Sequence, residues 1–528
     1  MKRSFLLLST LLALTVSSRA ELKLPTIIGD NMVLQQKQED PIWGWDTPGT
    51  KVTVTFAGQT KTAEADKGGK WTVKLDAMPA NATPQIMTIK GTTERAVQNI
   101  LIGEVWMCSG QSNMQFGLNG DWNGDIEALA TNNPNLRLIS VPQVGTQEAQ
   151  NDFKGAWAAC TPDNCKGFTA VGFYYGRYLQ QILGVPVGLI NNAWGGSAAE
   201  AWVRRDSLAK DERFKLLMDG WKVREEQLTS DKAKADFEAA MVKWKEDDAK
   251  AKAEGKTPPR APGSPQATLA GNARPGNIFN GVVYPTLGYG MKGVIWYQGE
   301  SNAGRAWEYA QLFPYMIEQW RAEWKQGDFP FYWVQLADFL AESAEPGDSS
   351  WAELRESQTK TQSLANSGQA VIIDIGEGKD IHPKNKQAVA ARLVRLALAK
   401  DYGIKVPFHS PELKGVQFEG QKAIVTLDMF GSTLRPFDVE EAIGFAVCGD
   451  DKAWHWAKGK VVGGDKIEVI SEKVLKPVAV RYAWANNPVC NLFSKEGLPV
   501  TPFRSDDFEM TTKPKPPVTA EVKPAAQK

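Results

Sequence analysis

The chain has 528 residues, of which 42% are hydrophobic and 23% are charged, as is usual for a globular protein. A chain of this length exceeds what one hydrophobic core can organise, so roughly two to four domains are expected. Lysine plus arginine equals aspartate plus glutamate at 61 each, and this balance gives no electrostatic reason to expect a nucleic-acid partner.

The first twenty residues have the pattern of a secretory signal. A basic start, Met1–Arg3, precedes an apolar run over 4–16, and Ser18–Ala20 forms a small-x-small cleavage site. We therefore predict a signal peptide over 1–20, cut after Ala20, and a secreted or periplasmic protein. The apolar run is too short to cross a bilayer comfortably and no later run is long enough, so no membrane span is expected.

The five cysteines suit an oxidising compartment. Cys160 and Cys165 are close in sequence, and Cys448 and Cys490 lie in one later region, so two disulfides with these partners are expected. Cys108 is left over in an apolar run, which is typical of a buried thiol. No cysteine–histidine cluster has zinc spacing, and three histidines leave little room for a histidine metal site. We expect no metal and no cofactor.

Residues 21–98 have the pattern of a β domain. Side chains alternate between apolar and polar in Val52–Phe56 and again in Trp71–Leu75, and the turn residues Asp66–Gly69 separate such runs. A small N-terminal β-sandwich is expected here.

Between residues 99 and 403 the pattern changes to apolar runs that end in polar or glycine-rich turns, separated by helical stretches. The runs are 100–108, 185–190, 293–297, 331–336 and 370–375, and the helical stretches include 168–183 and 309–324. Alternation of strand and helix predicts an α/β fold with a doubly wound parallel sheet. Ligands bind such sheets beyond the carboxyl ends of the strands.

Three further segments complete the chain. Residues 204–270 are rich in charged residues and alanine, which predicts a solvated helical insertion. Residues 404–512 return to β character, with strands expected at 421–427 and 478–484. The tail, 513–528, is rich in proline, lysine and alanine and is expected to be disordered.

Polar turns follow three of the predicted strands and suggest chemistry at one sheet edge. The first holds Ser112, where a hydroxyl can act as a nucleophile if a base reaches it and N–H groups stabilise the oxyanion. Met114 stands where a G-x-S-x-G elbow has its second glycine, so that motif is absent. Taken by itself, Ser112 is better explained as a helix cap. The other two turns are 191–197 and 296–302.

Histidine is the usual base for serine chemistry near neutral pH, and the chain has three. His409 lies in a linker, and His455 lies between tryptophans in the late β region. His382 follows the fifth predicted strand and precedes a helix expected over 387–398, with Asp380 two residues upstream to orient its ring. His382 is therefore the best candidate for the base.

Four stretches now carry a resemblance to a known family: 103–115, 188–202, 295–303 and 380–386. Together they resemble the SGNH hydrolase superfamily, and specifically the sialate O-acetylesterase family of carbohydrate esterases. The resemblance extends over most of 22–510 and implies an SGNH hydrolase domain flanked by N- and C-terminal β-sandwich-like domains. The superfamily's first block is usually Gly-Asp-Ser, whereas here it is Gly110-Gln111-Ser112. A literal Gly347–Ser349 lies in a polar loop with no preceding strand and is interpreted as chance.

The resemblance implies roles for the residues that match. Ser112 resembles the nucleophile, with its own N–H as one oxyanion donor. Gly196 matches the second-block glycine donor, and Gly195 is the close alternative. The third-block asparagine is not evident after Gly299, so Gln298 or Asn302 stands in its place as the third donor.

His382 resembles the base of the same family. The superfamily spaces the acid and the histidine as D-x-x-H, whereas Asp380 precedes His382 by two residues. Asp380 is our first choice of acid, and Glu377, Asp374 and Glu300 stay open, as does a Ser–His dyad.

The expected function is that of a secreted carbohydrate esterase that removes O-acetyl groups from sugars by a Ser–His mechanism. Its partner would be an acetylated carbohydrate, either sialic acid or a plant or algal polysaccharide. A non-catalytic glycan-binding protein and a general lipase or aryl esterase are the alternatives. The sequence leaves the oligomeric state open.

Overall fold

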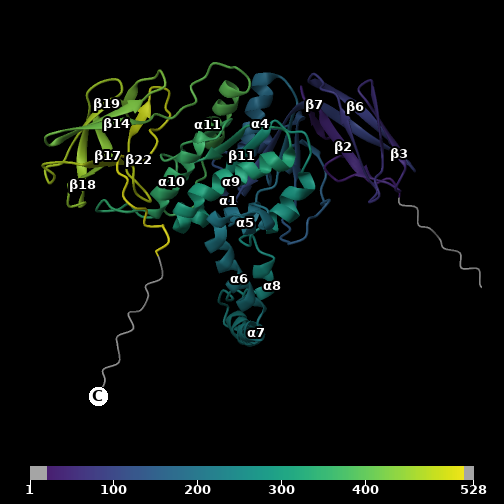
Figure 1. Cartoon of the computed structure of the whole chain (residues 1–528), viewed down its shortest axis with the longest axis horizontal. Helices are drawn as coiled ribbons and strands as arrows, with labels where there is room; N and C mark the ends of the chain where they lie inside the picture. The colour runs from purple at the N-terminus through teal and green to yellow at the C-terminus, as the bar shows by residue number, and fades with distance from the viewer. Residues whose placement is uncertain (1–20, 516–528) are drawn as a thin grey trace, which may run out of the picture.

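The computed structural model describes residues 21–515. The predicted signal peptide, 1–20, and all but the first three residues of the predicted tail, 513–528, lie outside this range. Figure 1 shows a central α/β unit between two β regions, with a helical arm that projects from the centre.

The centre of the molecule is a largely parallel sheet with strand order β13-β12-β11-β7-β10-β8-β9, in which only β9 runs antiparallel to its neighbour. The strands are β7 (Glu94–Gly110), β8 (Asn133–Ser140), β9 (Ala158–Cys160), β10 (Val187–Asn191), β11 (Gly293–Tyr297), β12 (Phe331–Val334) and β13 (Ser367–Ala370). The parallel α/β core predicted from the sequence is confirmed.

Two details of the sheet differ from the prediction. The last strand, β13, ends at Ala370, where the predicted run begins, because the chain leaves the sheet while its apolar side chains stay buried. The parallel strand β8 was not predicted. It carries Arg137, whose buried guanidinium donates hydrogen bonds to the side-chain oxygens of Asn31 and Asn99. A strand that buries a charged side chain in this way lacks the continuous apolar run that marked its neighbours.

Helices cover both faces of the sheet, because successive side chains along a strand point to opposite sides. Met107 and Trp296 pack with α9 (Ala306–Trp324) in one core cluster, whereas Trp106 and Ile295 pack in a second cluster. The second cluster contains the buried faces of α4 (Ala170–Leu183) and α11 (Lys386–Lys400). Helices were predicted at each of these three places, and they are confirmed within a few residues.

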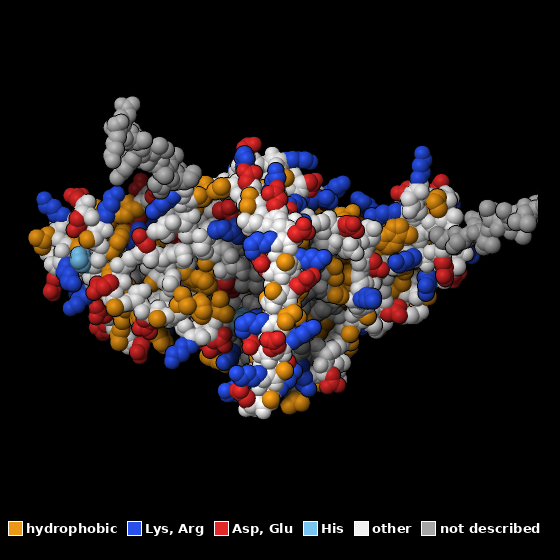
Figure 2. Space-filling view, turned by 90° about the horizontal axis from the view of Figure 1, so that it is seen from below, with side chains coloured by type: hydrophobic (Ala, Val, Ile, Leu, Met, Phe, Trp, Pro, Cys, Tyr) orange, Lys and Arg blue, Asp and Glu red, His pale blue; other side chains and the backbone are white. Residues whose placement is uncertain are grey.

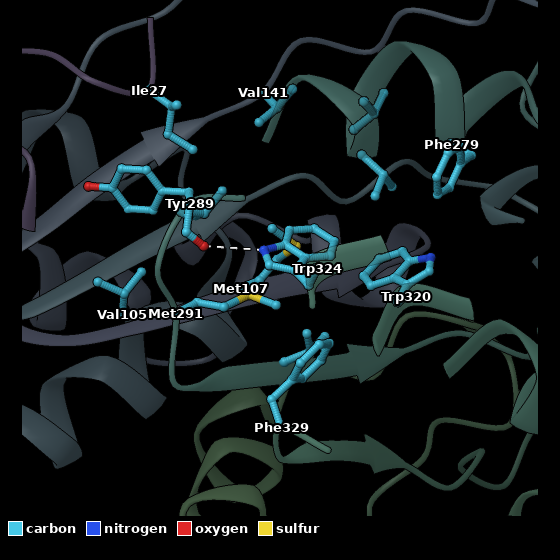
Figure 3. Packing of buried hydrophobic residues seen from close by; sticks show 14 of the residues in the cluster. Ile27, Val105, Met107, Val141, Phe279, Tyr289, Met291, Trp320, Trp324 and Phe329 are labelled. Atoms are coloured by element: carbon cyan, nitrogen blue, oxygen red, sulfur yellow. Dashed lines mark hydrogen bonds between the residues drawn. The ribbon is translucent and has the colours of Figure 1, made fainter. Parts of the chain in front are cut away.

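Aromatic side chains dominate the first cluster, as Figure 3 shows near one end of α9. Trp320 and Trp324 lie with ring centroids 5.9 Å apart, and Trp324 packs edge-on against Phe329. The indole N–H of Trp324 donates a hydrogen bond of 3.2 Å to the carbonyl of Tyr289. A buried indole N–H needs such a partner, so this contact fixes the end of α9 against the segment that leads into β11.

The N-terminal strands share β7 with the central sheet. They are β1 (Val33–Gln35), β2 (Asp40–Trp45), β3 (Lys51–Phe56), β4 (Gln59–Glu64), β5 (Lys70–Leu75) and β6 (Asn81–Lys90). Strands β2 and β5 pair with each other, β3 pairs with β4 and β6, and β6 pairs with β7. Because β7 is 17 residues long, its first part belongs to this β region and its last part to the parallel core. The domain boundary predicted at residue 98 therefore lies within a continuous strand.

The C-terminal region forms a separate, barrel-like antiparallel sheet with strand order β14-β15-β19-β18-β17-β20-β22 (Figure 1). Its strands are β14 (Glu412–Glu419), β15 (Lys422–Asp428), β17 (Glu441–Cys448), β18 (Trp454–Val461), β19 (Lys466–Ile470), β20 (Ala479–Tyr482) and β22 (Phe503–Arg504), with β16 (Leu434–Pro436) and β21 (Leu492–Ser494) as a separate pair. The two strands predicted here from the sequence are confirmed as β15 and β20.

The two predicted disulfides are wrong, because all five cysteines are free thiols in the structure. Burial raises the pKa of the Cys160 thiol to about 12, and that thiol is a hydrogen-bond neighbour of Cys165 rather than its covalent partner. Cys448 ends β17 and pairs in the sheet with Trp454 and Ala479, away from Cys490. Cys448 and Cys490 lie in the same region of the chain, but the fold does not bring their side chains together.

The helical insertion forms the arm seen in Figure 1, from α5 (Arg205–Lys210), α6 (Lys215–Thr229), α7 (Asp231–Ala253) and α8 (Pro265–Leu269). No residue of α7 is buried. Acidic and basic side chains are interspersed over the arm in the view from below (Figure 2). Lys243 and Asp247 of α7 form one of its ion pairs. The predicted solvated helical character is confirmed. Within residues 21–515, none of the helices has the length and apolar character that crossing a membrane requires.

A buried arginine joins the central unit to the C-terminal region. Arg355, in α10 (Ser350–Lys360), is fully buried and donates to the carbonyls of Leu336 and Ala337 after β12, and to those of Ala485 and Asn486 after β20. Burial lowers the pKa of Arg355 to about 10, so the side chain keeps its charge at neutral pH. The carbonyls of Leu336 and Ala485 have no other donor among residues 21–515, whereas those of Ala337 and Asn486 also accept the Trp351 indole N–H and the Phe339 N–H.

Replacing Arg355 with Met should destabilise the protein without touching the predicted catalytic residues. The change leaves the Leu336 and Ala485 carbonyls without a donor and removes one of two donors from each of the other two carbonyls, and we expect a loss of about 3 kcal/mol or more in the free energy of unfolding. Chemical denaturation followed by tryptophan fluorescence measures it, with Arg355→Lys as a control that keeps one donor and loses less. A loss below about 1 kcal/mol in Arg355→Met would contradict the role given to this side chain.

Candidate active site

Ser112 lies where two neighbouring strands end close together. Gly110, the last residue of β7, has φ of 135°, and a Cβ there would approach the Tyr297 carbonyl oxygen to 2.2 Å. Only glycine therefore fits at this position beside the paired strand β11. The Gln111 N–H then donates to the same Tyr297 carbonyl, and the short helix α1 (Ser112–Gln115) begins at Ser112. The turn leaves Ser112 half-buried at the carboxyl edge of the sheet.

The side chain of Asn113, directly after Ser112, joins three segments of the chain. Its buried amide nitrogen donates to the Glu300 carboxylate at 2.6 Å and to the Ile381 carbonyl at 2.9 Å. Its amide oxygen accepts a hydrogen bond of 2.5 Å from the Lys386 ammonium. The helix that carries Ser112 is thereby fixed to the turn after β11, to the loop that carries His382 and to the start of α11.

A ring contact brings His382 to the same helix. The imidazole of His382 stacks on Phe116 with ring centroids 6.3 Å apart and planes 26° apart. Phe116 follows Ser112 by four residues, so both lie on one face of the turn. The Phe116 ring therefore connects His382, the predicted base, to the helix that carries Ser112, the predicted nucleophile.

Asp380 is the carboxylate in contact with His382. Its Oδ1 lies 3.5 Å from the imidazole Nδ1 and also accepts the His382 backbone N–H at 2.9 Å. This backbone contact forms a tight turn, and the turn lets a carboxylate two residues away reach the ring. Burial lowers the pKa of His382 below its ordinary value; Asp380 opposes that shift and the nearby Lys386 adds to it. The imidazole is thus neutral and able to accept a proton at neutral pH.

The other three candidate acids have different partners. Both oxygens of Asp374 are held by the Arg392 guanidinium, at 2.6 and 2.7 Å. Glu377 accepts the backbone N–H of Lys384 at 2.9 Å. Glu300 is held by Asn113, and burial raises its pKa. Of the four, Asp380 alone has a recorded contact with the His382 ring.

The two candidate glycines have different surroundings. The Gly195 N–H donates to the side chain of Gln115 at 2.7 Å, and a Cβ on Gly195 would lie 3.4 Å from the Cβ of Ser112. Gly196 is exposed with φ of 69°, and its N–H has no hydrogen-bond partner among residues 21–515. The Ser112 N–H, at the first position of α1, is likewise unpaired in the described part of the chain. These two N–H groups are available to a ligand oxygen.

The side chains of Gln298 and Asn302 form hydrogen bonds within the protein, beneath the site. Both are buried, and the Gln298 amide nitrogen donates to the Ser197 carbonyl and to the Asn302 side chain, which uses both of its hydrogens. Asn302 accepts the Ala199 N–H at 2.9 Å and donates to Glu200 at 3.0 Å. These contacts fix the loop after β10, which contains both glycines, against the turn after β11.

Asn272 was not foreseen from the sequence. Its side-chain nitrogen donates to the Gly195 carbonyl, and a Cβ on Gly196 would lie 3.2 Å from that nitrogen. This nitrogen has a second hydrogen with no partner in the described structure. Asn272 follows the helical insertion, 77 residues after Gly195, in a stretch without any motif, so no local signal could have found it.

Residues 102–235 and 283–397 match the family model described as a carbohydrate esterase, sialic acid-specific acetylesterase. The chain belongs to this family of carbohydrate esterases. Ser112 and Gly196 lie in the first matched segment, and Gln298 and His382 lie in the second. The unmatched gap between the segments contains α8 and all of α7 beyond residue 235.

Members and relatives of this acetylesterase family are similar over nearly the whole chain. A carbohydrate acetylesterase from Xanthomonas citri has 36% sequence identity and a TM-score of 0.78, with 92% of this chain and 100% of that chain covered. The sialate O-acetylesterase of Mus musculus is 28% identical over 529 residues, covering 90% of this chain and 93% of its own. That of Homo sapiens is 28% identical over 523 residues, covering 90% and 91%.

No group of three or more histidine, cysteine, aspartate or glutamate side chains within residues 21–515 is arranged to hold a metal ion.

In this acetylesterase-family chain, Asp380→Asn should lower kcat/KM for an acetyl ester by about tenfold or more, because the imidazole loses the carboxylate that orients it. Glu377→Gln should stay within about threefold of the wild type, and Asp374→Asn should lower the melting temperature more than the rate, because its partner is Arg392. Steady-state kinetics and thermal unfolding of the three variants check this. Near-wild-type kinetics in Asp380→Asn with a collapse in either of the others would identify a different acid.

Proposed function

We propose that the protein is a secreted carbohydrate O-acetylesterase with an SGNH-type catalytic unit, in which Ser112 is the nucleophile and His382 the base. The observation that carries the proposal is the contact between the Ser112 helix and the His382 loop, made by the Phe116–His382 stack and the Asn113–Ile381 hydrogen bond. Membership of a carbohydrate esterase family supports the reaction class. Export rests on the sequence pattern of residues 1–20.

The mechanism begins with attack of the Ser112 hydroxyl oxygen on the acetyl carbonyl carbon while His382 accepts the hydroxyl proton. The N–H groups of Ser112 and Gly196 stabilise the oxyanion that forms. We assign the free amide hydrogen of Asn272 as the third donor, since both hydrogens of Gln298 are used within the fold.

Collapse of the first intermediate breaks the bond to the sugar oxygen, and His382 returns its proton to that oxygen so that the sugar leaves as an alcohol. Ser112 is then acetylated. A water molecule attacks the acetyl carbonyl and gives its proton to His382, and acetate leaves as the Ser112 hydroxyl is restored. Asp380 orients the imidazole through both steps.

The substrate is an O-acetylated sugar. The mammalian relatives are named for sialate and the Xanthomonas citri relative for carbohydrate in general. We propose sialic acid or a plant or algal polysaccharide as the acetylated partner. Acetate release from a panel of acetylated sialic acids, xylans and pectins distinguishes these classes.

Ser112→Ala should abolish acetate release, by about 10⁵-fold or more, while the melting temperature stays near that of the wild type. The matched control is Ser349→Ala. Ser349 caps α10 by accepting the Ala352 N–H at 3.0 Å, so its loss should cost about 1 kcal/mol of stability and leave the rate unchanged. Full activity in Ser112→Ala would remove the proposed nucleophile.

The pH profile of kcat/KM should rise through an apparent pKa below the ordinary imidazole value of about 6.5. The base must be neutral, and burial of His382 disfavours its protonated form, so the acid limb moves to lower pH. Stopped assays of acetate release across the acid range measure this limb. An acid limb at or above the ordinary imidazole value would contradict the burial of a neutral base.

A further inference from the structure

Lys386 is a buried, charged residue beneath the site, and it has no role in the mechanism proposed above. It is the first residue of α11 and has no exposed surface. Its backbone N–H donates to Asp121 at 2.8 Å, and its ammonium has one hydrogen-bond acceptor among the described residues, the side chain of Asn113. A buried ammonium is costly, so a single amide acceptor suggests a task other than stability.

Two aromatic rings complete the surroundings of this ammonium. The Lys386 Nζ lies 5.0 Å from the ring centroid of Phe116 and 5.2 Å from that of Tyr297. Phe116 is the ring on which His382 stacks. Lys386 therefore contacts both links between the Ser112 helix and the His382 loop: the Asn113 amide and the Phe116 ring.

We propose that Lys386, acting through Asn113 and Phe116, is a positioning residue that holds the His382 loop against the Ser112 helix. This inference rests on the proposed function. By accepting the hydrogen bond from Lys386, the Asn113 amide is fixed in one orientation, with its nitrogen directed to Glu300 and to the Ile381 carbonyl. Ile381 is the residue before His382, so the position of its carbonyl governs that of the base.

The positive charge of Lys386 also favours the neutral form of the His382 imidazole, which is the form that accepts a proton. Burial lowers the pKa of Lys386 to about 7, so the ammonium is charged across the acid range in which His382 titrates. A positive charge nearby disfavours a second one on the imidazole and lowers the pKa of His382. Four acidic groups oppose the lowering of the Lys386 pKa by burial. They are Glu300 after β11, Asp121 before α2 (Gly124–Leu129), and Asp380 and Glu377 on the His382 loop. Asp380 opposes the lowering of the His382 pKa.

The test replaces Lys386 with Met, which keeps the length and removes the charge and the donor. With three histidines in the chain, ¹⁵N-histidine labelling gives few ring signals, and His409 and His455 are internal controls. In Lys386→Met the pKa of His382 should rise while those of the other two stay fixed. The kcat for acetyl-ester hydrolysis should fall about 10- to 100-fold with KM within about threefold, because the base is displaced while binding groups remain.

Two companion variants separate charge from structure. Lys386→Arg keeps the charge and should return the His382 pKa toward the wild-type value. Lys384→Met, on the same segment but with a partly exposed side chain 3.9 Å from Glu377, should leave both the pKa of His382 and kcat unchanged.

An unchanged His382 pKa and an unchanged kcat in folded Lys386→Met would overturn the inference. Should that variant not fold, Lys386→Gln, which keeps a donor for Asn113, decides by the same two measurements; failure of both to fold would assign Lys386 to folding alone and overturn the positioning role. The ring titration does not depend on turnover. A wild type without acetylesterase activity would therefore refute the proposed function and still leave the effect of Lys386 on His382 measurable.

Discussion

The site depends on one buried amide, the side chain of Asn113. It gives two hydrogen bonds and accepts one, and its partners come from the turn after β11, the His382 loop and the start of α11. These segments lie 187 to 273 residues away along the chain. A serine and a histidine can act as a pair only if the chain holds them to within a fraction of an ångström, and here the residue next to the serine fixes the His382 loop to the Ser112 helix. The rest of the fold supplies rigid platforms for the three partners.

The parallel sheet positions the segments that carry these partners. Parallel strands β7, β10 and β11 end at one edge, and Gly110 leaves room for the Tyr297 carbonyl of the neighbouring strand β11, so that the Ser112 turn is held by a backbone contact. The loop after β10 brings Gly196 and its unpaired N–H to the same edge, where Gln298 and Asn302 hold that loop from beneath. Aromatic packing of α9 on one face, and of α4 and α11 on the other, keeps the edge fixed.

Much of this arrangement was predictable from the sequence, and the exceptions have physical causes. Continuous apolar runs marked the strands of the parallel core, but β8 was not predicted because it buries the charged side chain of Arg137, whose guanidinium is hydrogen-bonded to asparagine side chains. The Ser112 and His382 turns were found because their residue types carry chemistry. Asn272 was not, since its place beside Gly195 depends on how the arm returns to the core. Lys386 lay within a recognised stretch, yet its burial is a tertiary property that local sequence does not reveal. The disulfide predictions failed because closeness in sequence does not align two thiols.

The central claim is that Ser112 is a nucleophile activated by His382, and covalent labelling tests it most directly. A fluorophosphonate ester reacts with a serine only when a base activates it, and peptide mass spectrometry then locates the modified residue. The account predicts one label, on the peptide that carries Ser112, and loss of that label in a folded His382→Ala variant. A label on another serine, or undiminished labelling of Ser112 without His382, would contradict it.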